Sequence, residues 1–332
     1  MDRFRPELLI VAAAVLWGTT GTAQDLGDVG AAPVAVGVAR IALGGALLAV
    51  LAWATRSRSG HAPLSSGTER EDQNGDLDRS GHSHSRVDAN RDDQNRWGWG
   101  VPGAVGAGIV AVAGYQACFF AAVERAGVAL GTLVAIGSGP VFTGIVALVA
   151  SRERPVPRWY PATGLAVAGC ALLLAPGGDS ELDAVGLGLA LGAGLSYAVY
   201  TVAAKAVLSR GVPGPTVMAT FFLGGALLLA PAVLFADTDG LTTGKGLAMV
   251  FWLGVATTAV SYVFFRAGLQ RLRSSTVATL SLTEPRTAAL LGVVVLGERP
   301  GLVAVLGALV LLSGLLVIST GRPLAVDPVP EP

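Results

Sequence analysis

Long, nearly uninterrupted apolar stretches constrain this chain more than any other feature of its sequence. A helix needs about 20 apolar residues to cross ~30 Å of hydrocarbon. The runs are too long for strands and lack period-2 alternation. All backbone polar groups must be satisfied within lipid, so we expect an all-α integral membrane protein with ten transmembrane helices. The predicted spans are 8–24, 34–53, 99–122, 128–150, 159–175, 185–205, 214–235, 246–266, 274–296 and 301–319.

The composition supports this class and excludes others. Hydrophobic residues make up 52% of the 332 residues and charged residues only 14%, against about 25% charged residues in an average soluble domain. This excludes a disordered chain and an ordinary soluble enzyme. The 23 Lys and Arg residues are balanced by 23 Asp and Glu residues, so we expect no nucleic-acid partner. Cys118 and Cys170 lie inside apolar runs, and we expect them to pack rather than form a disulfide framework.

Residues 55–97 interrupt the apolar pattern with Ser, Gly, Asn, Asp, Glu and Arg. Such a segment cannot bury enough surface to offset its chain entropy, so it is predicted to be a disordered loop between the second and third spans. The three histidines, His61, His82 and His84, all lie in this segment. A weakly chelating tract is the alternative interpretation, but a solvated low-complexity loop is favoured and no metal site is predicted.

The charges that flank the spans predict the orientation of the chain. Most Lys and Arg residues lie in segments that share a side with the N-terminus, including those around Arg152, Arg210 and Arg271, so both termini are predicted to be cytoplasmic. Arg3 and Arg5 before the first span also fit a signal peptide, but a discarded leader would have no counterpart in a repeat. The preference for Arg over Lys, with abundant Ala, Gly and Val, favours a bacterial inner membrane.

The two halves of the chain repeat each other. Gly44-Gly45-Ala46-Leu47-Leu48 recurs as Gly224-Gly225-Ala226-Leu227-Leu228, and Glu153-Arg154-Pro155 recurs as Glu298-Arg299-Pro300 at a shorter spacing. The difference in spacing is close to the length of the polar loop, which is therefore an insertion in the first copy. Five spans per copy is an odd number, so the second copy is inverted, as in transporters that alternate access around a central site. The predicted units are a first repeat at 8–175 with a cytoplasmic insertion at 55–97, a second repeat at 184–319, and a cytoplasmic tail at 320–332.

Short motifs lie in order along the two copies: Leu16-Trp17-Gly18, Arg40, Gly139-Pro140-Val141-Phe142, Thr283-Glu284-Pro285 and Leu296-Gly297-Glu298-Arg299. Their order, spacing and duplication resemble the drug/metabolite transporter superfamily, with the EamA family as the most similar branch. The resemblance covers nearly the whole chain except 55–97 and the tail after 320. It implies ten-helix exporters or exchangers of small metabolites, amino acids or drugs.

Three ionisable residues fall inside predicted spans, where each costs roughly 2.5–3.5 kcal/mol on insertion scales. They are Arg40 in the second span and Glu284 and Arg286 in the ninth, and we predict that they bind substrate or couple transport. Pro285 frees a carbonyl, which membrane depth tolerates only where it faces protein or water. Pro140 is its repeat counterpart, so both are predicted helix breaks. A structural ion pair of Glu284 with Arg40 or Arg286 is the alternative.

Aromatic and hydroxyl groups recur at helical spacing on the first, third, sixth and eighth spans, which pair across the two copies. We predict a central cavity lined by both halves, with aromatic walls formed by Trp17, Tyr197 and Tyr262. The alternative is that these polar groups satisfy helix–helix hydrogen bonds. Glu153 and Glu298 are interpreted as boundary residues, with a gating role as the alternative. The remaining predicted cavity residues are Tyr115, Gln116, Tyr200 and Ser261.

These features favour a secondary active transporter, which exports a small metabolite such as an amino acid or a drug-like compound by alternating access. No P-loop is present, so coupling would use an ion gradient, with Glu284 taking up and releasing a proton, or exchange. The spans lack the His and Asp residues of intramembrane enzymes, so no enzyme and no cofactor are predicted. An uncoupled facilitator or exchanger is the alternative, and a non-transporting receptor is a third class. The expected partners are a small-molecule substrate and the lipid bilayer; protons and a homodimer are left open.

Overall fold

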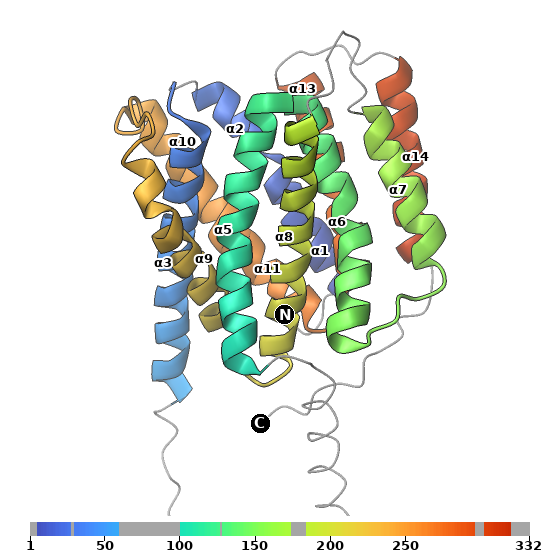
Figure 1. Ribbon diagram of the computed structural model, residues 1–332, viewed down its shortest axis with the longest axis horizontal. Coiled ribbons are helices and arrows are strands. Elements are labelled where there is room, and N and C mark those ends of the chain that lie inside the picture. Colours follow the sequence, from blue (N-terminus) through green and yellow to red (C-terminus); the bar gives the residue numbers. More distant parts are fainter. Residues whose placement is uncertain are drawn as a thin grey trace, which may run out of the picture.

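The computed structural model describes residues 5–27, 30–59, 100–126, 128–173, 184–295 and 302–319, and every regular element in these ranges is a helix. The three histidines, Glu298 and the tail lie outside these ranges. In chain order the helices are α1 (Pro6–Gly18), α2 (Thr20–Gly27), α3 (Pro33–Ser59), α5 (Val101–Ala126), α6 (Val128–Ser151), α7 (Trp159–Leu173), α8 (Ala184–Leu208), α9 (Gly214–Val233), α10 (Gly244–Gly254), the π-helix η1 (Val255–Val260), α11 (Ser261–Leu269), α12 (Ser274–Ser281), α13 (Thr283–Val294) and α14 (Leu302–Ser319) (Figure 1).

Seven helical stretches within the described ranges are long and apolar enough to cross a membrane, which confirms an all-α membrane protein. The predicted spans at 159–175 and 274–296 are also helical, but α7 has only 15 residues and the second is divided into α12 and α13. The count of ten spans therefore stays a prediction. The seven stretches are Pro6–Gly27, Pro33–Arg56, Val101–Ala122, Val134–Ser151, Ala184–Leu208, Gly214–Val233 and Gly244–Leu269.

The boundary of the predicted polar loop differs from the structure at its start. Helix α3 continues through Ser59, although the loop was expected from residue 55. The hydroxyl of Thr55 donates to the carbonyl oxygens of Leu51 and Ala52, at 3.0 Å each, so it adds bonds to the last apolar turns. The helix thus extends past the end of the hydrophobic run. The predicted loop residues 60–97 lie outside the described residues.

Large apolar side chains cover the outer surface of the bundle. Leu227, Val50, Leu234 and Phe235 are among the exposed ones, and helices that are apolar on all sides are typical of a membrane environment. Inside, small residues allow close helix contacts. A Cβ atom built on Gly194 of α8 would lie 2.1 Å from Ser138 Oγ of α6, and one on Gly108 of α5 would lie 2.2 Å from the Phe221 ring of α9.

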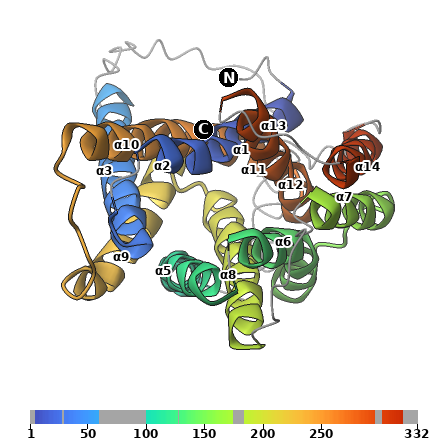
Figure 2. The ribbon, with the colours of Figure 1, turned by 90° about the horizontal axis from the view of Figure 1, so that it is seen from above.

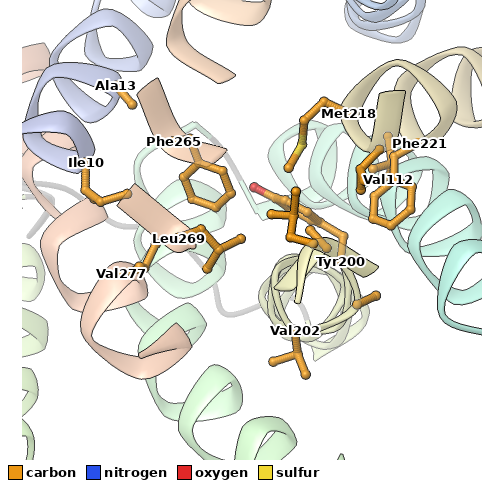
Figure 3. Packing of buried hydrophobic residues seen from close by; sticks show 14 of the residues in the cluster. Ile10, Ala13, Val112, Tyr200, Val202, Met218, Phe221, Phe265, Leu269 and Val277 are labelled. Carbon is orange, nitrogen blue, oxygen red and sulfur yellow. The ribbon is translucent and has the colours of Figure 1, made fainter. Parts of the chain in front are cut away.

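Two groups of helices face each other in the view from above. Helices α1, α2, α11 and α13 lie on one side, and α5, α6 and α8 lie on the other (Figure 2). Helix α1 contacts α11 and α13, α5 contacts α8 and α9, and α7 contacts α14. Figure 3 shows the buried cluster between the two groups, where Phe265 of α11 lies near Tyr200 of α8 and Met218 of α9.

Three long helical stretches change geometry near their middles. The chain turns at Thr19 between α1 and α2, where Thr19 Oγ1 donates to the Leu16 carbonyl at 2.7 Å. The stretch 244–269 contains the π-helix η1, a feature often found at functional sites. The third change is at Leu282, between α12 and α13. All three lie close in sequence to predicted site residues: Trp17, Ser261 and Glu284.

The two prolines predicted as helix breaks behave differently. The chain breaks at Leu282, shortly before Pro285. At Pro140, by contrast, α6 is continuous from Val128 to Ser151 and contains the proline. The hydroxyl of Thr143 donates to the Gly139 carbonyl at 2.8 Å there. Membrane helices tolerate an internal proline where Ser or Thr side chains and neighbouring helices satisfy the polar backbone.

Candidate functional site

Five aromatic rings from three helices pack together in the interior, and we call Trp17, Tyr197, Tyr200, Tyr262 and Phe265 the aromatic cluster. The ring centroid of Trp17 on α1 lies 5.2 Å from that of Tyr262 and 5.4 Å from that of Phe265, both on α11. The Tyr197 and Tyr200 rings of α8 lie 5.2 Å apart, and those of Tyr200 and Tyr262 are 6.5 Å apart. These separations are in the range of favourable aromatic contacts, so α1, α8 and α11 meet through this cluster.

The polar atoms of the cluster form hydrogen bonds between helices. Trp17 Nε1 donates to Ser261 Oγ at 2.9 Å, and the hydroxyl oxygens of Tyr200 and Tyr262 are 3.1 Å apart. Tyr197 donates its hydroxyl to Ser281 Oγ at 3.0 Å, which ties α8 to α12. Each bond joins positions far apart in sequence. The structure therefore brings together four of the five predicted aromatic residues, Trp17, Tyr197, Tyr200 and Tyr262, with Ser261. These bonds also fit the alternative, in which the polar groups satisfy helix–helix hydrogen bonds.

Arg40 and Glu284 approach the cluster from different helices, α3 and α13. Their charges act on each other, and both act on the hydroxyl groups of Tyr115 and Tyr262. These four groups therefore face a common region of the interior. Arg40 Nε is buried and has no hydrogen-bond partner, and among the described residues neither Arg40 nor Glu284 takes part in an ion pair.

The same residues keep accessible surface although they lie deep in the bundle. Burial desolvates Glu284, Tyr115, Tyr197 and Tyr262. Each of these side chains, like that of Arg40, is nevertheless only half-buried. These side chains are therefore not fully enclosed by the protein. A charged group at membrane depth that lacks a protein partner is a candidate ligand-binding group.

Other predicted residues lie elsewhere. Arg286 is exposed, whereas Arg40 and Glu284 are both half-buried. Gln116 is buried on α5, and its Oε1 lies against α3, 3.5 Å from where a Cβ atom of Gly37 would stand. Tyr115 stacks on Phe119 with ring centroids 5.6 Å apart. Gln116 thus contributes to helix packing.

The sequence reasoning missed two rings of this region. Phe265 belongs to the aromatic cluster, and Phe222 of α9 contacts Tyr262 edge-on with centroids 4.4 Å apart. The signal for Phe265 is its helical spacing, since residues four apart share a helix face and Ser261 was already a predicted site residue. Within the described ranges no group of three or more His, Cys, Asp and Glu side chains could hold a metal ion.

A cavity of about 410 Å³ lies between α2, α10 and α13. Its lining includes Thr19, Trp252 and Leu291, and Lys245 lies at the start of α10. Trp252 Nε1 donates to Thr19 Oγ1 at 3.0 Å. Thr19, which lines this cavity, follows Trp17 of the aromatic cluster by two residues in the sequence.

Comparison with known proteins places these features in a family. The profile of the EamA-like transporter family matches residues 184–320. The chain is 35% identical to the uncharacterized transporter YwfM of Bacillus subtilis over 312 residues, 94% of this chain and 93% of that protein. It is 32% identical over 208 residues to the threonine/homoserine exporter RhtA of Escherichia coli K12, covering 61% of this chain and 67% of RhtA. A solved crystal structure shares the fold, with a TM-score of 0.71 at 22% identity, covering 95% of this chain and 96% of that one.

Proposed function

Because this chain belongs to the EamA-like transporter family, and is thus a multi-pass membrane transporter rather than an enzyme, we propose that it exports a small zwitterion such as an amino acid. The substrate would bind between the aromatic cluster, Arg40 and Glu284. In this proposal Arg40 holds the substrate carboxylate and Glu284 holds the ammonium group. The similarity to RhtA, a threonine/homoserine exporter, supports an amino acid as the first class to test.

The observation that carries the proposal is the pair of unpartnered opposite charges. Arg40 and Glu284 lie near enough to interact electrostatically, yet they form no ion pair with each other. Arginine and carboxylate groups recognise the complementary ends of a zwitterion through charge-assisted hydrogen bonds. Such bonds are strong at depth, because the surroundings are poorer in water. The neighbouring rings supply apolar surface for the rest of the substrate.

Alternating access is the mechanism that the arrangement supports best. The cluster is built from both halves of the chain, with α1 in the first half and α8 and α11 in the second. We propose that these halves are inverted repeats of five spans each, with the termini in the cytoplasm and the protein in the inner membrane. The family match to residues 184–320 coincides with the proposed second repeat. A site between two such repeats opens to either side when one repeat moves against the other.

We propose that Glu284 also couples transport to protons. A carboxylate that binds the substrate ammonium in one state and a proton in the other exchanges the two across the membrane. Glu284 follows the helix break at Leu282 by two residues, so a change in the backbone there would alter its surroundings. An uncoupled facilitator or an exchanger is the alternative, in which Glu284 binds substrate without changing its own protonation.

The test is uptake of a panel of amino acids into proteoliposomes with an imposed proton gradient. Wild type should accumulate its substrate, Glu284→Gln should lose gradient-driven accumulation, and Arg40→Gln should weaken substrate binding. Arg286→Gln is the matched control, because Arg286 is exposed and lies two residues further on the same helix. Gradient-independent equilibration by both wild type and Glu284→Gln would favour the facilitator. Loss of transport in Arg286→Gln alone would refute the assignment of the site.

A further inference from the structure

A buried ion pair connects three segments at one end of the bundle, at the lower ends of α6 and α8 in Figure 1. Lys205 lies in the last turn of α8, and Glu153 lies two residues beyond the end of α6. Lys205 Nζ is 3.2 Å from Glu153 Oε2, with the two side chains 11% and 13% exposed. A pair so poorly accessible to water is uncommon, because both charges lose most of their hydration.

Each member of the pair also bonds to the segment that leads into α12. Lys205 Nζ donates to the Leu272 carbonyl oxygen, and the backbone N–H of Ser274 donates to Glu153 Oε1 at 2.7 Å. Ser274 is the first residue of α12, where a free amide and the helix dipole favour a carboxylate. The two charges are therefore well bonded only when α6, α8 and α12 are packed together, as Figure 2 shows for α6, α8 and α12.

The backbone before Glu153 takes an unusual conformation. Arg152 has φ of 53° and is the only non-glycine residue with positive φ in the described part of the chain. The N–H of Glu153 donates to the Ala147 carbonyl at 3.2 Å, and Arg152 between α6 and Glu153 takes the left-handed conformation that glycine usually supplies at a helix end. This turn directs Glu153 from the end of α6 toward α8.

We propose that Glu153 and Lys205 form a latch that closes this end of the transport path, and that the path opens here only when the pair separates. The inference rests on the proposed alternating access. The latch joins a segment of the first half, the end of α6, to α8 and α12 of the second half. Lys205 follows Tyr197 of the aromatic cluster by eight residues along α8, or ~12 Å. Lys205 therefore lies between Tyr197 and the end of α8.

The internal repeat gives the opposite end a different residue at the position that corresponds to Lys205. The spacing that relates Gly44-Gly45 to Gly224-Gly225 relates Asp25 to Lys205. An acidic residue thus replaces the lysine in the first repeat, so it cannot pair with a glutamate. At that end the structure has the cavity of about 410 Å³, lined in part by Ala23 and Leu26 on either side of Asp25. Among the described residues, one end of the bundle thus has a buried ion pair and the other has an open pocket.

The latch can be tested by the accessibility of a cysteine introduced at a buried position, without any transport measurement. Thr201 lies one turn before Lys205 on the same face of α8 and is fully buried. Thr201→Cys would be placed in a background in which Cys118 and Cys170 are replaced by Ala. A membrane-impermeant maleimide is then applied in vesicles to the side on which residues 151–158 lie, and the labelling rate is measured.

We expect labelling at position 201 to be slow with the intact pair and to rise by about tenfold in Glu153→Gln and in Lys205→Met. Glu153→Gln keeps an acceptor for the Ser274 amide and removes only the charge, so it is the variant least prone to misfold. The double variant should be labelled at about the rate of the single variants, because both act on one interaction. Lys245→Met is the matched control, since Lys245 is the other lysine of the chain and is exposed at the opposite end.

Unchanged labelling in folded Glu153→Gln protein would overturn the latch and leave the pair as a packing contact. An equal rise in Lys245→Met would overturn it as well, because the effect would then be general loosening. The outcome is independent of the proposed substrate. If no amino acid is transported but labelling responds to the pair, the latch stands and the substrate assignment fails.

Discussion

Replacing Gly18 by alanine tests whether the contact between α1 and α13 positions the site. Gly18 is the last residue of α1 and directly follows Trp17. An added Cβ atom would lie 2.6 Å from Thr287 Cβ and 2.7 Å from the Glu284 carbonyl oxygen. Both neighbouring atoms are held by the backbone of α13, so a change of rotamer cannot move them away. Carbon contacts are usually ~3.5–4.0 Å, so the two helices must separate by roughly 1 Å.

The expected cost follows from two opposing effects. Overpacking of this kind destabilises by about 1–3 kcal/mol, while alanine favours a helix over glycine by up to about 1 kcal/mol. We expect Gly18→Ala to lower the free energy of unfolding by about 1–2 kcal/mol. We also expect a reduced kcat/KM for transport, because the shift moves the backbone of Glu284 relative to Trp17. Thermal unfolding of the purified protein in detergent measures the first effect, and proteoliposome uptake measures the second.

Gly21→Ala is the matched control, because no atom lies within 4 Å of where its Cβ would stand. It lies three residues further along, in α2, and should leave the Tm unchanged or slightly raised. The reasoning is refuted if the two variants have the same Tm, or if Gly18→Ala is as stable and active as wild type. Either result would mean that α1 and α13 are not in the close contact described above.

Three further predictions use pairs of residues in the same way. Tyr200→Phe and Tyr262→Phe should each reduce substrate affinity. The double variant should lose little more affinity than either single variant, because both remove the same hydroxyl contact of 3.1 Å. The KM for uptake measures this, and fully additive losses would contradict it. Thr279→Val should lower the free energy of unfolding by about 0.5–2 kcal/mol, because it leaves the buried Thr163 hydroxyl without its partner at 2.9 Å. Thermal unfolding of Thr279→Val, Thr163→Val and the double variant measures the coupling between the two hydroxyl groups. Gly194→Ala should lower the Tm, because the added methyl group would clash with Ser138 and the Ala135 carbonyl. Gly188→Ala on the same helix meets nothing within 4 Å and should leave the Tm unchanged. Equal Tm values for the two variants would contradict the packing of α6 on α8.

Much of the fold follows from local sequence. Hydropathy over about 20 residues predicts a membrane helix, and the helices at 33–59, 184–208 and 214–233 contain or nearly match the expected spans. The helix predictions succeed because burial in lipid acts on each segment separately. Trp17, Tyr197 and Tyr262 were predicted to line a central cavity; their rings lie in one aromatic cluster, and the cavity stays a prediction. Proton coupling, the inverted repeat and the substrate stay predictions.

The local geometry of the broken helices was not predictable in the same way. The turn at Thr19 and the π-helix at 255–260 involve no proline within them, and Pro140, which was expected to break its helix, lies in a continuous one. Whether a helix breaks depends on how neighbouring helices satisfy the freed backbone groups. The presence or absence of a proline in the sequence is therefore a weak predictor of a helix break when the neighbouring helices are unknown.

The sequence by itself determined that this is an all-α membrane protein and which charges fall within its apolar stretches. Only the tertiary structure decided which of those charges meet. It left Arg286 exposed, set Arg40 and Glu284 near each other without an ion pair, and joined Glu153 to Lys205 and Ser274. The physical reason is range. Hydrophobic burial is read from a residue and its near neighbours, whereas an ion pair requires a few ångströms between atoms on different helices, which packing of the whole bundle sets.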